Sequence, residues 1–163
     1  MKGAEDRERR PSLTPGGRVA VDDAGRVRDW FDLGVPRLTA EAFAPDDLAR
    51  RFLDQHAAAF GWTPRLADLR PAATLRIAGA LSVRFTQEHH GLPVDASEVV
   101  VNMYADSRIQ SVYNQYRYDI PADLRPDAAR VDAVSARRVV ARLTGMFTNR
   151  EIGPPRLIVY PYR

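Results

Sequence analysis

The sequence predicts an α+β fold in which one helix packs across a curved antiparallel sheet of three or four strands. Residues 45–61 are amphipathic with a helical period, and three β-rich runs follow them with short connections. Short connections favour antiparallel neighbours, because a parallel pair needs a crossover of a dozen or more residues. An N-terminal hairpin and a C-terminal helix–strand unit are expected beside this core, and 163 residues are enough to bury it.

The chain opens with a polar stretch that precedes the first predicted hairpin. Residues 1–17 are rich in charge, proline and glycine, which predicts a flexible arm. Residues 18–21 and 26–32 then alternate in polarity on either side of the tetrapeptide DDAG at 22–25. Aspartate and glycine tolerate the positive φ angles of a tight turn, so these two runs predict a β-hairpin.

Residues 45–61 carry both the end signals and the apolar stripe of one helix. Pro45 suits the first helical position, and Gly61 suits a left-handed C-terminal cap. The acidic pair at 46–47 favours the positive end of the helix dipole. The apolar stripe consists of Leu48, Phe52, Leu53, His56 and Phe60. A 3.6-residue period aligns these positions, so this face of the helix is expected to be core.

Residues 73–88, 95–105 and 108–118 predict three neighbouring strands of an antiparallel meander. The first run alternates, and its positions on one face are Leu81, Val83, Phe85 and Gln87. The second run has three valines in succession at 99–101, which predicts a central strand that is apolar on both faces.

A second helix and a short strand are predicted after a proline-containing loop at residues 121–132. Asp132 can cap a helix over residues 133–145. The apolar stripe of this helix consists of Ala136, Val139, Val140 and Leu143. In the final run at 156–163, Pro161 removes one ladder donor, so this strand is expected at a sheet edge.

Residues 45–120 resemble a known family in several motifs at once. The residues that carry the resemblance are Val83, Arg84, Phe85, Gln87, Gly91, Pro93, Val94, Glu98 and the run Val99 to Val101. They follow a helix that ends in Phe-Gly, and they form a strand, a turn and a valine-rich strand in that order. This pattern is similar to the FTP domain, the propeptide module of fungalysin and thermolysin. The arrangement of helix and sheet expected for it is cystatin-like.

The tail of the chain resembles the opening of a PepSY-like unit, through VSARRVVARLTG and then PPRLIVYPY. The predicted organisation is therefore a flexible arm at 1–17, an FTP-like domain at 18–125 and a partial PepSY-like unit at 126–163. Both units commonly precede the catalytic domain of secreted zinc metalloproteases, where the resemblance implies an intramolecular chaperone and inhibitor. The expected function is a non-catalytic, propeptide-like binding module whose partner is a metalloprotease catalytic domain, in cis or in trans.

No cofactor, metal ion or nucleic acid is expected as a partner. The absence of cysteine excludes disulfides, thiolate zinc sites and iron–sulfur clusters. His89 and His90 are adjacent on a strand end, so they are expected to point to opposite faces of a solvated hairpin tip and not to share a metal. Arginines alternate with 15 aspartates along the chain, so the net charge of +3 does not predict nucleic-acid binding.

The sequence also bears on location. Its first residues are charged where a signal peptide would be apolar, and no run approaches the roughly 18 apolar residues of a membrane span. As written, the chain is expected to be cytoplasmic and not bound to a membrane. If a leader has been removed, it is expected to be secreted.

Tyrosines and their polar neighbours on the third run are the main candidate binding residues. Tyrosine combines apolar area with a hydroxyl group, which suits a binding surface as well as a core edge. An open edge of this third strand is expected to receive a peptide by β-augmentation. The candidate binding residues are Gln87, His89, His90, Tyr113, Gln115, Tyr116, Arg117 and Tyr118.

A helix over a curved sheet can instead enclose a small-molecule pocket, which leaves a stand-alone ligand-binding protein or small enzyme as the alternative. Its candidate catalytic residues are His56, Arg84 and Gln87. The simpler interpretation of His56 is a core histidine whose ring nitrogens bind backbone or tyrosine groups. No nucleophile elbow, phosphate loop or dinucleotide fingerprint occurs, so no motif supports catalysis. A purely structural scaffold domain is a third possibility.

Overall fold

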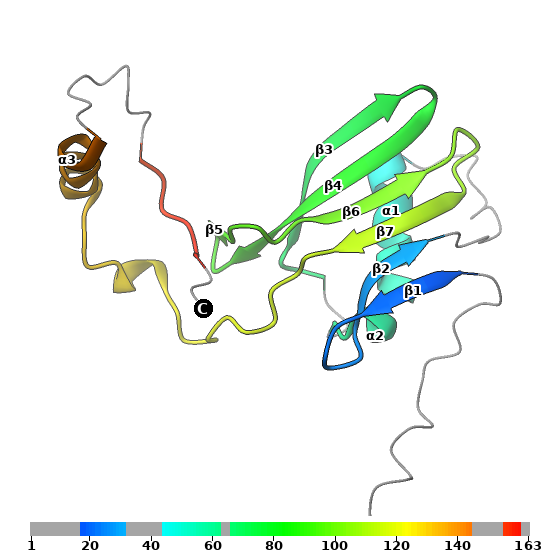
Figure 1. Ribbon diagram of the computed structural model, residues 1–163, viewed down its shortest axis with the longest axis horizontal. Helices are drawn as coiled ribbons and strands as arrows, with labels where there is room; N and C mark the ends of the chain where they lie inside the picture. The colour runs from blue at the N-terminus through cyan, green and yellow to red at the C-terminus, as the bar shows by residue number, and fades with distance from the viewer. Residues whose placement is uncertain (1–16, 32–43, 63–65, 145–154, 161–163) are drawn as a thin grey trace, which may run out of the picture. The chain divides into compact units, whose positions relative to one another are not determined.

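The computed structural model describes residues 17–31, 44–62, 66–144 and 155–160, in an α+β fold built on an open antiparallel sheet (Figure 1). This architecture confirms the predicted fold class. The chain divides into a first unit, residues 1–87 with 96–116, and a second unit, residues 88–95 with 117–163. Residues 1–16 of the predicted arm at 1–17 lie outside the described residues.

The sheet has the strand order β1-β2-β7-β6-β4-β3, with β5 paired to the end of β4. The strands are β1 Arg18–Val21, β2 Val27–Phe31, β3 Leu69–Ile77, β4 Ala80–His89, β5 Leu92–Pro93, β6 Val99–Met103 and β7 Ile109–Asn114. The predicted hairpin at the N-terminal end is confirmed as β1 and β2. The predicted central position of the valine-rich strand is also confirmed, because β6 pairs with β4 on one side and β7 on the other.

The turn between β1 and β2 is fixed by Asp22. Its carboxylate accepts hydrogen bonds from the backbone N–H groups of Ala24 and Arg26, at 3.0 and 2.9 Å, and from Arg26 Nε at 2.7 Å. Partial burial raises the pKa of Asp22, but the Arg26 backbone N–H and guanidinium, with the Ala24 N–H, hold this pKa below its usual value of 3.8. The charged form of Asp22 is therefore the one that stabilises the turn.

The predicted first run of residues 73–88 proved to be two strands rather than one. β3 and β4 form a hairpin around the two-residue turn Ala78-Gly79, in which both residues have positive φ angles, 48° and 85°. Such a turn matches the twist of antiparallel strands and usually contains asparagine or aspartate before glycine. Alanine occupies that position here, and apolar character continues through the turn, so the sequence carried little sign of it.

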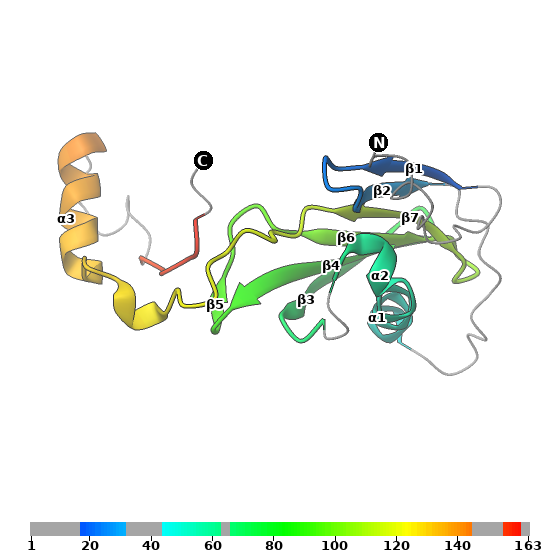
Figure 2. The ribbon, with the colours of Figure 1, turned by 90° about the horizontal axis from the view of Figure 1, so that it is seen from below.

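Two helices cover one face of the sheet in the first unit, α1 Pro45–Gln55 and α2 Ala57–Phe60 (Figure 2). The prediction of a single helix was wrong at His56, whose backbone leaves the helical region with φ −111° and ψ 14°. There the Phe52 carbonyl oxygen accepts both the imidazole Nδ1–H at 2.8 Å and the His56 backbone N–H at 3.2 Å. Gly61 then caps α2 with φ 70°, as predicted.

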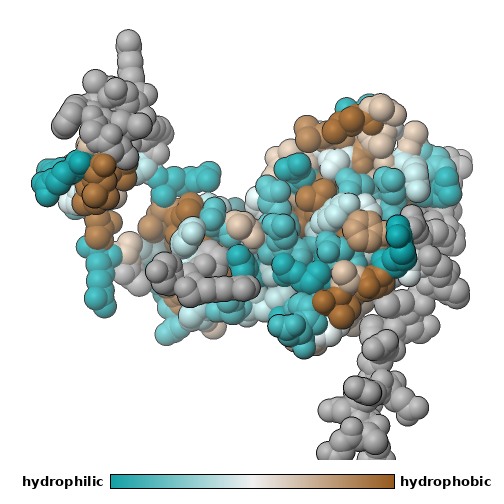
Figure 3. Space-filling model, in the orientation of Figure 1, coloured by the Kyte–Doolittle hydropathy of each residue, from teal (hydrophilic) through white to brown (hydrophobic). Residues whose placement is uncertain are grey.

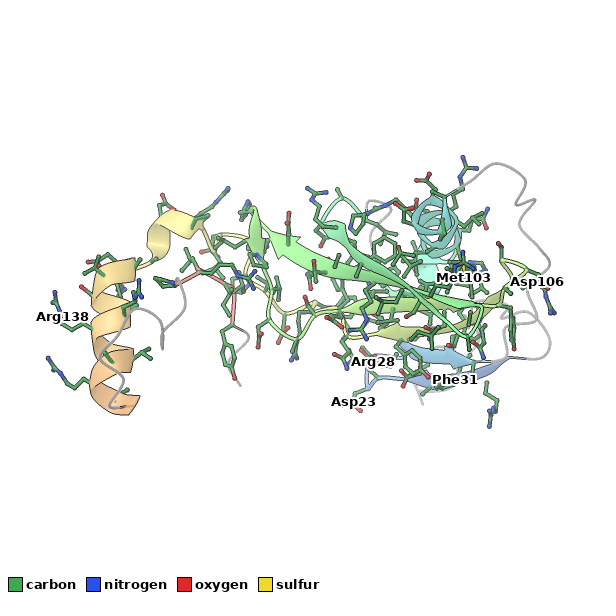
Figure 4. The ribbon with its side chains drawn as sticks, turned by 90° about the horizontal axis from the view of Figure 1, so that it is seen from above. Asp23, Arg28, Phe31, Met103, Asp106 and Arg138 are labelled. Atoms are coloured by element: carbon green, nitrogen blue, oxygen red, sulfur yellow. The ribbon has the colours of Figure 1, made fainter. Side chains whose placement is uncertain are left out.

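The core of the first unit lies between these helices and the sheet. Its largest fully buried side chains are Trp30, Phe52, Phe60, Phe85, Leu53, Leu69 and Met103. The Trp30 ring lies 6.0 Å from the Phe52 ring and 6.1 Å from the Phe60 ring, so β2 and both helices meet in one aromatic cluster. Met103 lies on the α1 side of the sheet, whereas Phe31 lies on the other side (Figure 4).

The second unit has fewer buried side chains. It contains the end of β4, β5, the short helix η1 Pro126–Ala128, and α3 Ala133–Thr144. As predicted, Asp132 caps α3, because its carboxylate accepts the Ser135 N–H at 2.8 Å. This hydrogen bond, with that from the Ser135 hydroxyl group, holds the pKa of Asp132 below its usual value.

The predicted apolar stripe of α3 is exposed within the described residues, where Val139, Val140 and Leu143 are 53%, 42% and 80% exposed. In residues 155–160, the described part of the predicted strand at 156–163 forms a single parallel bridge, between Val159 and Val94. Pro161 lies outside the described residues. None of the described helices has both the length and the apolar composition needed to cross a membrane.

Candidate partner-binding surface

The face of the sheet that points away from α1 is a mixture of hydrophilic and hydrophobic surface (Figure 3), and the strand register places two rows of side chains across it. One row follows the register Asp29, Tyr113, Val100, Arg84 and Ala73. The other follows Phe31, Ser111, Asn102, Ser82 and Leu75. Opposed side chains on one face are close enough to interact, so both rows form a continuous surface.

Contacts within this face hold several of its side chains in place. The Tyr113 side chain is 40% exposed, and its ring meets Phe31 edge-on at 5.4 Å. Asn102 donates to the Ser111 hydroxyl oxygen at 3.0 Å. The predicted site residue Arg84 pairs with Glu98 at 3.3 Å near the start of β6. Exposed polar and aromatic groups that are already ordered lose less conformational entropy when a partner binds.

Two of the predicted site residues lie inside the first unit instead. Gln87 is only 3% exposed and faces the interior opposite Leu69. His56 is half-buried, its ring stacks on Phe52 at 4.3 Å, and it meets Trp30 edge-on at 5.3 Å. His56 thus has the environment of a core histidine bonded to backbone. Neither side chain is presented on the outer face of the sheet.

The predicted residues after β7 anchor the end of the strand. The Tyr116 hydroxyl group donates to the Asp68 carboxylate, and the Tyr116 ring packs 5.9 Å from Trp62. Gln115 is exposed, and its backbone N–H donates to the Glu98 carbonyl oxygen at 2.9 Å. The Tyr116 side chain therefore joins β7 to the segment that precedes β3, a structural role that the sequence did not indicate.

His89 and His90 belong to the second unit, and the expectation that they point to opposite faces was wrong. His90 lies in the turn with φ 48°, which takes its side chain out of the strand alternation. The two rings lie 4.4 Å apart. His89 Nε2 donates to the Leu124 carbonyl oxygen at 3.0 Å and His90 Nε2 to that of Ala122 at 3.1 Å. Both histidines therefore hold the loop that follows β7.

The remaining candidates, Arg117 and Tyr118, are half-buried residues of the second unit. The eight predicted binding residues are thus divided between the interior, the open face and the end of β7 in the first unit, and the second unit. Across the described ranges, no group of three or more histidine, aspartate or glutamate side chains has the geometry to hold a metal ion.

The edge of the third predicted strand is closed. β7 pairs with β6 on one side and with β2 on the other, through Asp29–Tyr113, Trp30–Val112 and Phe31–Ser111. The N-terminal hairpin therefore occupies the edge that was expected to receive a peptide. The actual edge strands are β1 and β3. The sequence signal available for β3 is Gly79, which is weak because alanine precedes it, and the signal for Phe31 is the alternation of β2.

The fold and this surface define an α+β module with an ordered open sheet face. Within it, residues 77–116 match the family model described as the fungalysin/thermolysin propeptide motif. The match begins at the last residue of β3 and includes all of β4, β5, β6 and β7. It confirms the FTP resemblance over these residues, a shorter stretch than the 45–120 expected from the sequence. No curated protein matches the chain.

Proposed function

We propose that this chain is a propeptide-like module that binds the catalytic domain of a zinc metalloprotease, in cis or in trans, without catalysing a reaction itself. The observation that carries the proposal is the propeptide motif at residues 77–116, because it covers the central strands of the sheet. Binding would inhibit the protease, assist its folding, or both. A sheet whose ordered face meets the partner suits this role, since preorganisation strengthens binding.

The packing of the first unit supports a binding module over an internal ligand pocket. Trp30, Phe52 and Phe85 are among the side chains that fill the space between the helices and the sheet, and each is almost completely buried. The inward-facing polar residue Asn114 is also satisfied, because its Nδ2 donates to the Val27 carbonyl oxygen at 2.8 Å. A small-molecule site at this position would need room that these side chains occupy.

The finer organisation is also a proposal. We infer a cystatin-like relation between α1 and the sheet in an FTP-like domain at 18–125, preceded by an arm at 1–17. Residues 126–163 would be a partial PepSY-like unit, supported by the order of α3 and the strand-like segment around Val159.

The function can be tested with the purified chain and the zinc metalloprotease encoded nearest to its gene. The chain is expected to bind the catalytic domain in calorimetry, and either to slow hydrolysis of a peptide substrate or to raise the yield of refolded protease. Bovine serum albumin at equal concentration is the control for non-specific effects. A chain that neither binds, inhibits nor assists refolding would rule out the proposed function.

A further inference from the structure

The outer side of β3 is an exposed sheet edge. β3 pairs with β4, and no strand in the ranges that the structure describes pairs with its other side. A sheet edge presents unpaired N–H and C=O groups that can receive a further strand. The question is which part of β3 is suited to this, and for what partner.

The hairpin geometry indicates which backbone groups of β3 face outward. Ile77 and Ala80 flank the two-residue turn at 78–79, and the pair that flanks such a turn is hydrogen-bonded. Along an antiparallel strand, bonded residues alternate with residues whose groups point away from the neighbour. Thr74 and Arg76 therefore direct their N–H and C=O groups outward.

The first half of β3 is blocked against pairing, and the second half is not. Pro71 has no N–H, and the register with β4 shifts between Pro71 and Ala73. Proline and irregular register are features that protect edge strands from other chains. From Ala73 to Ile77 the register runs without a shift up to the turn. The segment able to pair is therefore Ala73–Ile77.

In this segment, apolar side chains lie on one face of the sheet and an arginine lies on the other. Leu75 and Ile77 are 43% and 65% exposed, and they lie on the face opposite α1, where Leu75 pairs with Ser82. Apolar surface is visible in Figure 3 along the upper margin of the sheet, which β3 forms. Arg76 lies on the other face, opposite Leu81, and has no ion pair within the described residues.

Charge distinguishes a second copy of this chain from a different partner. β3 contains Arg70 and Arg76 and no acidic residue. Pairing of two copies would gather the arginines of both strands along one seam, which like-charge repulsion opposes. A segment that alternates acidic and apolar side chains would instead place carboxylates near Arg76 and cover Leu75 and Ile77.

We propose that Ala73–Ile77 receives an extended acidic segment of the metalloprotease partner as an additional strand of the sheet. This inference rests on the proposed function and deepens it, because it names the surface and the chemistry of recognition. Backbone hydrogen bonds to Thr74 and Arg76 supply affinity, and the alternating side chains supply specificity.

Paired variants of the full chain test this surface. Thr74→Pro removes an outward N–H without removing a β4 ladder bond, and its matched control Thr74→Ala removes only side-chain atoms. Arg76→Glu reverses the charge, and its control is Arg18→Glu on the opposite edge strand β1. Calorimetry should show that Thr74→Pro and Arg76→Glu each weaken binding to the catalytic domain by about tenfold or more. Both controls should stay within about twofold of the wild type.

Melting temperatures show whether each variant is folded. If Thr74→Pro does not fold, Arg76→Glu and its control still decide the question. Equal binding by the wild type, Arg76→Glu and Arg18→Glu would overturn edge pairing while leaving the proposed function intact.

Amide hydrogen exchange tests the edge without the protease. The probe is an acetylated and amidated peptide that alternates valine and glutamate, and the control peptide has lysine in place of glutamate. The glutamate peptide should slow exchange at Thr74 and Arg76, whereas Leu75, already bonded to β4, should change little. The inference would be contradicted if the two peptides had equal effects or if neither had an effect. It would also be contradicted if sedimentation showed that the free chain dimerises and that this dimer accounts for the protection. If the wild type binds no metalloprotease, the proposed function fails. The peptide experiment then tests only whether the β3 edge binds an acidic strand.

Discussion

The amphipathic helices α1 and α3 have similar sequence patterns and opposite surroundings. In the first unit, Phe52 and Leu53 on the stripe of α1 are completely buried against the sheet. In the second unit, Val139 and Leu143 on the stripe of α3 are exposed among the described residues, Leu143 by 80%. An apolar stripe therefore predicts a helix and the face it would bury, but not the element that covers this face.

The polar contacts of the two units differ in the same way. The Asn114 bond to the Val27 carbonyl oxygen is buried, whereas the bonds of His89 and His90 to their loop are exposed to water.

The second unit also contains an open cavity of about 480 Å³ lined by residues 129–133, Ala136 and 155–157. We expect most of the folding free energy to reside in the first unit, because burial supplies the main favourable contribution.

The largest expected effect compares truncations of the two helix stripes. Phe52→Ala should destabilise the first unit by about 3–5 kcal/mol, because it removes a buried ring and leaves a cavity. Leu143→Ala should change stability by less than about 0.5 kcal/mol, because this side chain is exposed. Urea denaturation followed by tryptophan fluorescence measures the effect of Phe52→Ala. Denaturation followed by circular dichroism measures the effects of both variants. A loss at Leu143 as large as that at Phe52 would show that α3 is covered in solution.

The second comparison concerns polar contacts. Asn114→Ala should cost about 1–3 kcal/mol, because it leaves the buried Val27 carbonyl oxygen without its donor. His90→Ala should cost less than about 1 kcal/mol, because water replaces the exposed bond to Ala122. Denaturation midpoints of both variants measure the difference. Equal costs would mean that the histidine loop contributes more than its exposure indicates.

Periodicity was sufficient to predict the elements whose burial is set locally. The alternation of Leu81, Val83 and Phe85 predicted the inward face of β4, and the turn at 22–25 predicted the first hairpin, because both depend on neighbouring residues only. The break of the long helix at His56 was missed, because the apolar stripe continues through His56 to Phe60 and only the backbone of His56 leaves the helical region.

Strand order, by contrast, depends on contacts that are distant in sequence. Trp30 pairs with Val112 across more than half the chain, and no local pattern of either strand indicates this partner. The open edge was therefore predicted on β7, although the β1–β2 hairpin covers β7 and leaves β3 at the margin. Of the predicted binding residues, Tyr113 lies on the open face, which also carries Arg84, a residue that the sequence suggested for the alternative pocket.

The smallest expected effect concerns the two aspartates that hold a turn and a helix start, one in each unit. Asp22 and Asp132 both have a pKa below the usual value of 3.8, because hydrogen bonds favour their charged forms. A lowered pKa in the folded state means that the contribution to stability is complete above the unfolded pKa near 4 and is lost as pH falls through the folded value. Asp22→Asn should therefore lower the urea midpoint at pH 7, and this difference from the wild type should shrink as the pH falls below 3.8, the usual pKa of this carboxyl group. Asp132→Asn should speed amide exchange of the Ser135 N–H at pH 7, and this effect should have the same pH dependence. The urea midpoint of the first unit should change little. If the Asp22→Asn difference were constant from pH 7 to pH 3, the Arg26 contacts would not stabilise the turn through its charge.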